Sequence, residues 1–162
     1  MTRDSITAVT SRAEFQDAVR SCLVLAADAG AREIFMIDPT FVDWPLSERA
    51  VIDTLQRWVA AGRTLTLMAH RFDELPRRHM RFVEWRRSWS HVVACRADED
   101  LEEQQIPTLL FVPGHVCLRM VDIVDQRGTL SGKPVDLSAG RETVDALLQR
   151  STEAFPVTAL GL

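Results

Sequence analysis

A histidine, a cysteine and an aspartate lie close together in the stretch HVCLRMVD, residues 115–122. Side chains alternate between the two faces of a strand, so His115 and Cys117 share a face. An imidazole beside a thiol can activate it as a nucleophile, but such a pair also needs an orienting acid. No acid is placed with this pair, so a thiol enzyme has little support.

A second group of chemically capable residues is the basic stretch HRFDELPRRHMRFVEWRRSWSH, residues 70–91, with six arginines and three of the four histidines. Planar guanidinium groups bind two oxyanion oxygens at once. The acidic run DEDLEE, residues 98–103, follows it. We interpret the acidic run as a solvated loop.

The apolar residues of the sequence alternate between helical and strand spacing, and the predicted helices and strands would position these residues. Apolar spacing and capping residues predict helices over 11–30, 47–62, 73–89 and 141–155. Apolar runs predict strands at 32–39, 63–70, 91–96, 107–112 and 115–121, with a turn at Pro113-Gly114 and a polar loop over 125–140.

Short links between the first three strands and their helices require parallel pairing with crossover connections. We therefore expect a single α/β domain over residues 1–162, with its core at about 11–155. Three parallel strands with crossover helices would be extended by an antiparallel hairpin, with helices on both faces of the sheet. The strand order is left open.

Ligands bind beyond the carboxyl ends of parallel strands. Asp38 ends the first predicted strand, and His70 and Arg71 end the second. We predict that His70, Arg71, Arg78 and His79 line a pocket at this edge, facing Asp38, which binds phosphate or sulfate. The alternative is that the arginines form structural ion pairs and that His79 is a hydrogen-bonded core residue.

The order of elements resembles one half-domain of the phospholipase D superfamily, over roughly residues 11–155. That family carries the motif H-x-K-x-x-x-x-D, in which the histidine is the nucleophile and the lysine holds a phosphate oxygen. In one register His115 and Asp122 match the motif, and Cys117 replaces the lysine. A neutral thiol cannot supply the charge of an ammonium group.

A second register fits the family's strand order better, because there the motif strand precedes a tight turn and a return strand. This register places Ile106, Thr108 and Pro113 at the motif positions, where no catalytic group remains. The resemblance implies a catalytically silent domain that acts as an anion-binding or protein-binding module.

Two alternatives stay open: a divergent phosphodiesterase or phospholipase that uses His115, His79 or His70, and a purely structural partner-binding domain. Because halves of this superfamily pair, we also expect a homodimer. Trp44 has no helical or strand face to join, and exposed apolar surface often marks an interface.

Composition and residue spacing argue against several other classes of protein. The net charge of −4 argues against general nucleic-acid binding. The chain has no apolar run long enough for a membrane span and no signal-peptide pattern. Cys22, Cys95 and Cys117 are few, scattered and in apolar runs, as expected for buried thiols in a cytoplasmic protein. No spacing indicates a metal or another cofactor.

Overall fold

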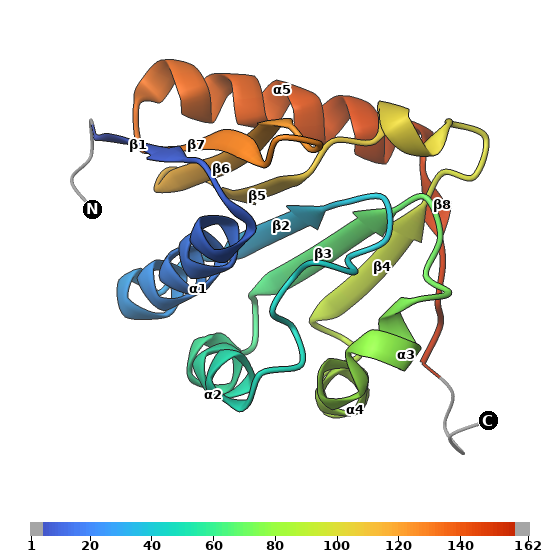
Figure 1. The fold of residues 1–162 in the computed structure, drawn as a ribbon. Coiled ribbons are helices and arrows are strands. Elements are labelled where there is room, and N and C mark those ends of the chain that lie inside the picture. Colours follow the sequence, from blue (N-terminus) through green and yellow to red (C-terminus); the bar gives the residue numbers. More distant parts are fainter. Residues whose placement is uncertain (1–4, 158–162) are drawn as a thin grey trace.

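The structure is a computed structural model that describes residues 5–157, and its strands form one sheet between two layers of helices (Figure 1). The strands are β1 (Ile6–Val9), β2 (Glu33–Ile37), β3 (Thr64–Ala69), β4 (Val93–Ala97), β5 (Leu109–Val112), β6 (Val116–Asp122), β7 (Arg127–Ser131) and β8 (Thr152–Glu153). The helices are α1 (Arg12–Ala29), α2 (Arg49–Trp58), α3 (Leu75–Arg78), α4 (Met80–Ser88), α5 (Pro134–Arg150) and the 3₁₀ turn η1 (Glu103–Gln105).

The eight strands lie in the order β1-β7-β6-β5-β2-β3-β4-β8. β2, β3 and β4 pair in parallel, and β5 pairs antiparallel with both β2 and β6. The expected α/β class is therefore confirmed, with its parallel strands and its antiparallel hairpin. The sequence did not predict β1, β7 or β8, which form the two ends of the sheet.

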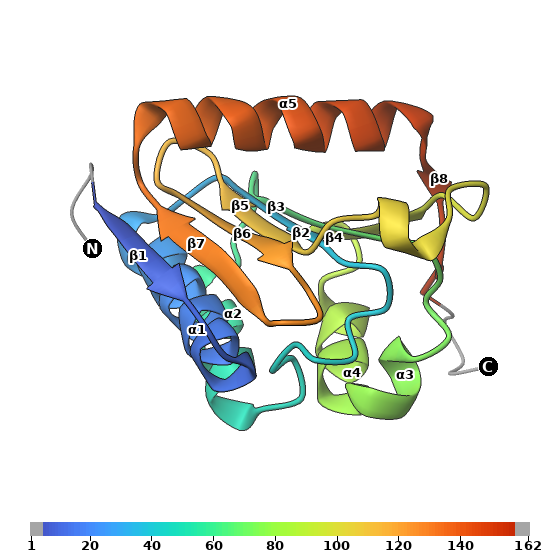
Figure 2. The same cartoon turned by 45° about the horizontal axis from the view of Figure 1, so that its top comes forward.

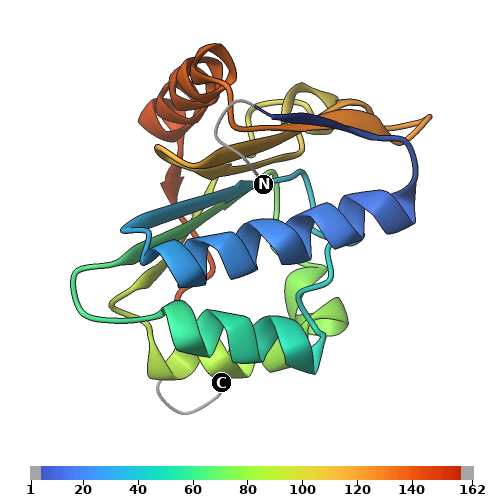
Figure 3. The same cartoon turned by 90° about the vertical axis from the view of Figure 1, so that its left-hand side faces the viewer.

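Helices cover the two faces of the sheet unequally. α1, α2 and α4 lie side by side on one face, whereas α5 alone crosses the other (Figures 2 and 3). The larger core, between the sheet and the three helices, includes Leu23, Ile34, Leu55, Trp58, Leu65 and Phe82. Beneath α5, Gly140 lies so near the sheet that a Cβ there would be 3.0 Å from Cys117 Sγ.

The predicted caps of the first helix are confirmed. Ser11 Oγ accepts a hydrogen bond from the Glu14 amide at 3.1 Å. Gly30 ends α1 with φ 63°, in the left-handed region that glycine adopts without steric penalty. α1 is consequently held at both ends by local sequence.

The predicted helix over 73–89 is wrong in one respect, because it breaks at His79 into α3 and α4. His79 has φ −132° and ψ 54°, which are not helical values. Its ring reaches across to the Phe41 carbonyl oxygen, at 2.7 Å, and this tertiary contact overrides the local helical pattern.

The predicted loop over 125–140 is also wrong. Residues 127–131 form β7, and α5 begins at Pro134, seven residues before the predicted start at residue 141. β7 contains Gly128, at which a Cβ would meet the Arg119 carbonyl oxygen at 2.4 Å. Gly128 is therefore needed because β6 and β7 lie so close together. Glycine and polar residues are typical of loops, so the local sequence of β7 predicted a loop.

Trp44 corrects a further expectation. It is only 2% exposed and packs edge-on against Phe15 and Phe41, with ring centroids 5.5 and 5.0 Å away. Trp44 belongs to the core and presents no apolar surface to a partner. Among the described helices, none has the length and apolar character to cross a membrane.

Candidate functional site

A cavity of about 390 Å³ opens at the carboxyl end of β2. Six segments of the chain contribute to it: α1, the loop after β2, η1, the start of β5, the end of β6 and the β6–β7 turn. Its lining residues are Phe15, Asp38, Pro39, Thr40, Asp43, Glu103, Gln104, Ile106, Thr108, Met120, Ile123 and Gln126.

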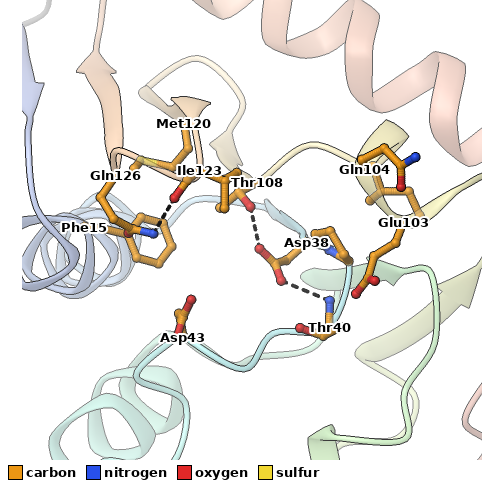
Figure 4. Close-up of a pocket in the computed structure, with 12 residues that line it drawn as sticks. Phe15, Asp38, Thr40, Asp43, Glu103, Gln104, Thr108, Met120, Ile123 and Gln126 are labelled. Atoms are coloured by element: carbon orange, nitrogen blue, oxygen red, sulfur yellow. Dashed lines mark hydrogen bonds between the residues drawn. The ribbon is translucent and has the colours of Figure 1, made fainter.

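The strand directions explain why these segments meet. β5 runs antiparallel to β2, and β6 runs antiparallel to β5, so the end of β6 reaches the same edge as the end of β2. The start of β5 lies there too. Figure 4 shows Phe15, Asp43 and Gln126 on one side of Asp38, and Glu103 and Gln104 on the other.

Asp38 lies in the middle of the cavity wall and holds the loop that follows β2. Its Oδ2 accepts hydrogen bonds from the amides of Thr40 and Phe41 at 3.0 and 2.7 Å. Its Oδ1 accepts one from the Thr108 hydroxyl at 2.5 Å. Three donors thus satisfy this carboxylate and join the β2 loop to the start of β5 (Figure 4).

Phe41 makes this loop unusual, because it is a buried non-glycine residue with φ 64°. Such a conformation is strained and persists only where surrounding contacts hold it. Asp38 binds the Phe41 amide, and His79 Nε2 lies 2.7 Å from the Phe41 carbonyl oxygen. The two contacts fix the loop from which Asp38 and Asp43 reach the cavity.

The cavity is acidic. Among residues 5–157, the charged side chains of its lining are Asp38, Asp43 and Glu103, and no lysine, arginine or histidine of this range lines it. Asp43 is partly neutralised by Arg12, whose Nη2 lies 3.0 Å from Asp43 Oδ1. Glu103 forms no side-chain hydrogen bond or ion pair within residues 5–157, so its carboxylate is available to a ligand.

Apolar side chains form a further part of the lining, beside the hydroxyls of Thr40 and Thr108 and the amides of Gln104 and Gln126. Phe15, Ile106 and Met120 are buried, whereas Ile123 is 51% exposed in the β6–β7 turn. Pockets that bind small molecules combine such an apolar surface with a few convergent polar groups. The cavity has both features.

The two predicted histidines lie beside the β2 loop but outside this lining. His79 is 4% exposed, and burial lowers its pKa below the usual 6.5 because the charged imidazolium is poorly solvated there. A carbonyl oxygen only accepts, so His79 Nε2 carries the proton and donates it. His79 Nδ1 and His70 Nδ1 are buried without a partner in the described chain.

The two predicted arginines point to carboxylates. Arg71 Nε lies 3.9 Å from Glu99 Oε1, and Arg78 Nε lies 3.5 Å from Glu74 Oε2. Neither arginine lines the cavity at the end of β2, although Asp38 does. Phosphate binding by His70, Arg71, Arg78 and His79 therefore stays a prediction, separate from this cavity.

His115 and Asp122 lie at opposite ends of β6. His115 is exposed in the turn before the strand, and Asp122 is its last residue. At a rise of roughly 3.3 Å per residue over seven residues, they are about 23 Å apart. Burial raises the pKa of the nearby Cys117 thiol to about 11, so it remains protonated at neutral pH. No three or more His, Cys, Asp or Glu side chains within residues 5–157 are grouped to hold a metal ion.

Comparisons with known proteins identify the fold. No protein-family model and no curated protein matches the chain. A solved structure of TrmBL2, an archaeal chromatin protein, superimposes with a TM-score of 0.65 and 12% identity over 95% of this chain. Nuc, a phospholipase D family member from Salmonella typhimurium, superimposes with a TM-score of 0.57 and 12% identity over 93% of this chain. The chain has a phospholipase D-like fold.

The two neighbours are matched to different extents. The match covers 97% of Nuc but only 55% of TrmBL2, so the chain spans about half the length of the archaeal protein. At 12% identity, these likenesses concern the fold alone.

The sequence singled out Asp38 as part of a phosphate pocket with His70, Arg71, Arg78 and His79, and did not connect it with the other residues of this cavity. Asp38 was detectable because it directly follows a parallel strand. Glu103 was assigned to a solvated acidic run, and Asp43 and Gln126 stand in loops with no motif. Their convergence depends on the antiparallel path of β5 and β6, which no local pattern specifies.

Proposed function

We propose that this chain is a phospholipase D-like binding module without phosphodiester-cleaving activity, and that it binds a small molecule in the cavity at the end of β2. The observation that carries the proposal is the cavity itself. Carboxylates and side-chain amides converge there over an apolar surface, within about 390 Å³.

The start of β5 supports a non-catalytic role. In the register that fits the family's strand order, Thr108 occupies the position of the motif lysine. Its side chain is buried and donates to Asp38, so it brings no positive charge to the site. Ile106 occupies the position of the nucleophile and belongs to the apolar lining. Ile106 has no nucleophilic atom, and the one hydroxyl proton of Thr108 is already donated to Asp38.

The alternative register also favours binding over hydrolysis. In that register Cys117 stands at the lysine position, and its buried thiol stays neutral, so it brings no positive charge to a phosphate. His79, another candidate nucleophile, is buried and already bonded to a backbone carbonyl.

Macromolecular partners have less support than a small ligand. TrmBL2 is described as a DNA-binding protein. Here, however, the net charge is −4 and the cavity lining holds carboxylates, which repel a phosphate backbone. Homodimer formation remains a prediction, and the burial of Trp44 removes the residue on which it partly rested.

The proposal is tested by a fragment screen and a hydrolysis assay on the same protein. Ile123→Trp places an indole at the cavity mouth from a position that is already 51% exposed. Val124→Trp is its matched control, because Val124 is 93% exposed in the same turn and does not line the cavity. We expect fragments that bind the wild type and Val124→Trp but not Ile123→Trp, together with no turnover of a chromogenic bis-phosphodiester above buffer.

Turnover that disappears in His115→Ala, His70→Ala or His79→Ala would instead establish a divergent phosphodiesterase. Fragment binding that is unchanged in Ile123→Trp would place the binding site elsewhere on the chain.

A further inference from the structure

We infer that the ligand of this cavity carries a positive charge on an apolar body, as an alkylammonium or arylammonium compound does. This inference rests on the proposed function, since it assigns a ligand class to the same cavity. It follows from the charge of the lining, from the one lining carboxylate that has no partner in the described part of the chain, and from the apolar surface opposite it.

The charge of the lining selects against anions. Three carboxylates and no basic side chain line the cavity, and Arg12 pairs with only one of them. An entering anion would meet this negative potential without a compensating donor of positive charge. A cation would be attracted by it, and because Glu103 is exposed, solvent keeps this attraction modest.

The three carboxylates differ in what they can offer a ligand. Asp38 already accepts three hydrogen bonds from the chain, and Asp43 pairs with Arg12 at the rim. Glu103 is uncommitted. It extends from η1 towards the Asp38–Thr40 loop (Figure 4). Glu103 is therefore the expected partner of an ammonium group, with Asp38 and Asp43 adding to the field.

The apolar side chains define the rest of the ligand. Phe15, Met120 and Ile123 lie on the α1 and β6–β7 side of the cavity, away from Glu103 (Figure 4). A bare metal ion gains nothing from this surface, and the described residues contain no cluster suited to one. A hydrocarbon or aromatic body would cover these side chains while its cationic end reaches Glu103.

Three probes with the same aromatic body separate charge from shape: 2-phenylethylammonium, 2-phenylethanol and 3-phenylpropionate. Ligand-detected NMR titration at neutral pH and constant ionic strength gives each dissociation constant. We expect the ammonium to bind about fivefold more tightly than the alcohol, because a charged hydrogen bond to a partly solvated carboxylate is worth this much. The carboxylate probe should bind most weakly. Added salt should bring the dissociation constants of the ammonium and carboxylate probes closer to that of the alcohol.

Glu103→Gln removes the charge and keeps the shape. It should weaken ammonium binding about fivefold, to the level of the alcohol, and leave alcohol binding unchanged. Asp100→Asn is the matched control, because Asp100 is an exposed carboxylate of the same acidic run that does not line the cavity. It should change neither affinity.

The outcomes distinguish this inference from the proposed function. If all three probes bind alike and lose binding in Ile123→Trp, the cavity is a ligand site but the cationic class is wrong. An unchanged ammonium affinity in Glu103→Gln also overturns the inference. If no probe binds the wild type while other fragments bind and are blocked by Ile123→Trp, only the inference fails. If no fragment is blocked by Ile123→Trp, the proposed function fails as well.

Discussion

Acidification should destabilise this protein through His79. In the fold this imidazole is buried, donates from Nε2 to the Phe41 carbonyl oxygen, and has no acceptor for a second proton at Nδ1. Burial lowers its pKa below 6.5, the ordinary value that it regains on unfolding. The unfolded chain therefore binds a proton more readily than the native one as the pH falls below that value.

The sign and size of the effect follow from this difference. The contribution of His79 to stability is fully present above pH 6.5 and is lost as the pH falls from there towards its lowered native pKa. One proton bound only by the unfolded state reduces the free energy of unfolding by at most about 1.4 kcal/mol per pH unit.

Urea denaturation followed by tryptophan fluorescence, at a series of pH values, measures this slope. His79→Gln keeps an amide N–H for the Phe41 carbonyl but cannot titrate, so the slope between pH 6.5 and the lowered pKa should become shallower by one proton. A slope in His79→Gln equal to that of the wild type would refute the assignment of a buried, neutral His79.

Three further substitutions test other parts of the fold by chemical denaturation. Trp44→Ala should destabilise by about 3–5 kcal/mol, as expected for a buried indole, whereas a loss below about 1 kcal/mol would mean that Trp44 is on the surface. Thr108→Val should cost about 1–3 kcal/mol, since Asp38 Oδ1 loses its donor, and a neutral result would deny that contact a structural role. Gly140→Ala should cost up to about 2 kcal/mol, because overpacking against Cys117 and Phe111 exceeds the roughly 1 kcal/mol by which alanine favours a helix over glycine. Ala146→Ser, exposed on the same helix, should be near neutral, and a stabilising Gly140→Ala would argue against close contact of α5 with the sheet.

Local patterns predicted the elements that carry their own start and stop signals. α1 has Ser11 and Gly30 at its ends, and the parallel strands are continuous apolar runs. The turn at Pro113-Gly114 likewise located the β5–β6 hairpin. These features depend on residues that are neighbours in sequence, so they can be recognised without a structure.

Other features depend on contacts between distant residues, which local patterns do not encode. β7 looks like a loop because Gly128 is needed for close approach to β6. The helical pattern through His79 gives no sign of the contact with Phe41, thirty-eight residues earlier. The same holds for the site: Asp38 was predicted from its strand end, but Glu103 joins it only through the antiparallel return of the sheet.

The central claim is that the cavity at the end of β2 is the ligand site, and amide chemical-shift mapping tests it most directly. In a titration of labelled protein with 2-phenylethylammonium, we predict that the largest shifts fall on Thr40, Asp43, Glu103, Gln104, Ile123 and Gln126, which line this cavity. The same titration of Ile123→Trp should leave these amides unmoved. Shifts centred instead on Arg71 and Arg78, or on the turn at His115, would contradict the account.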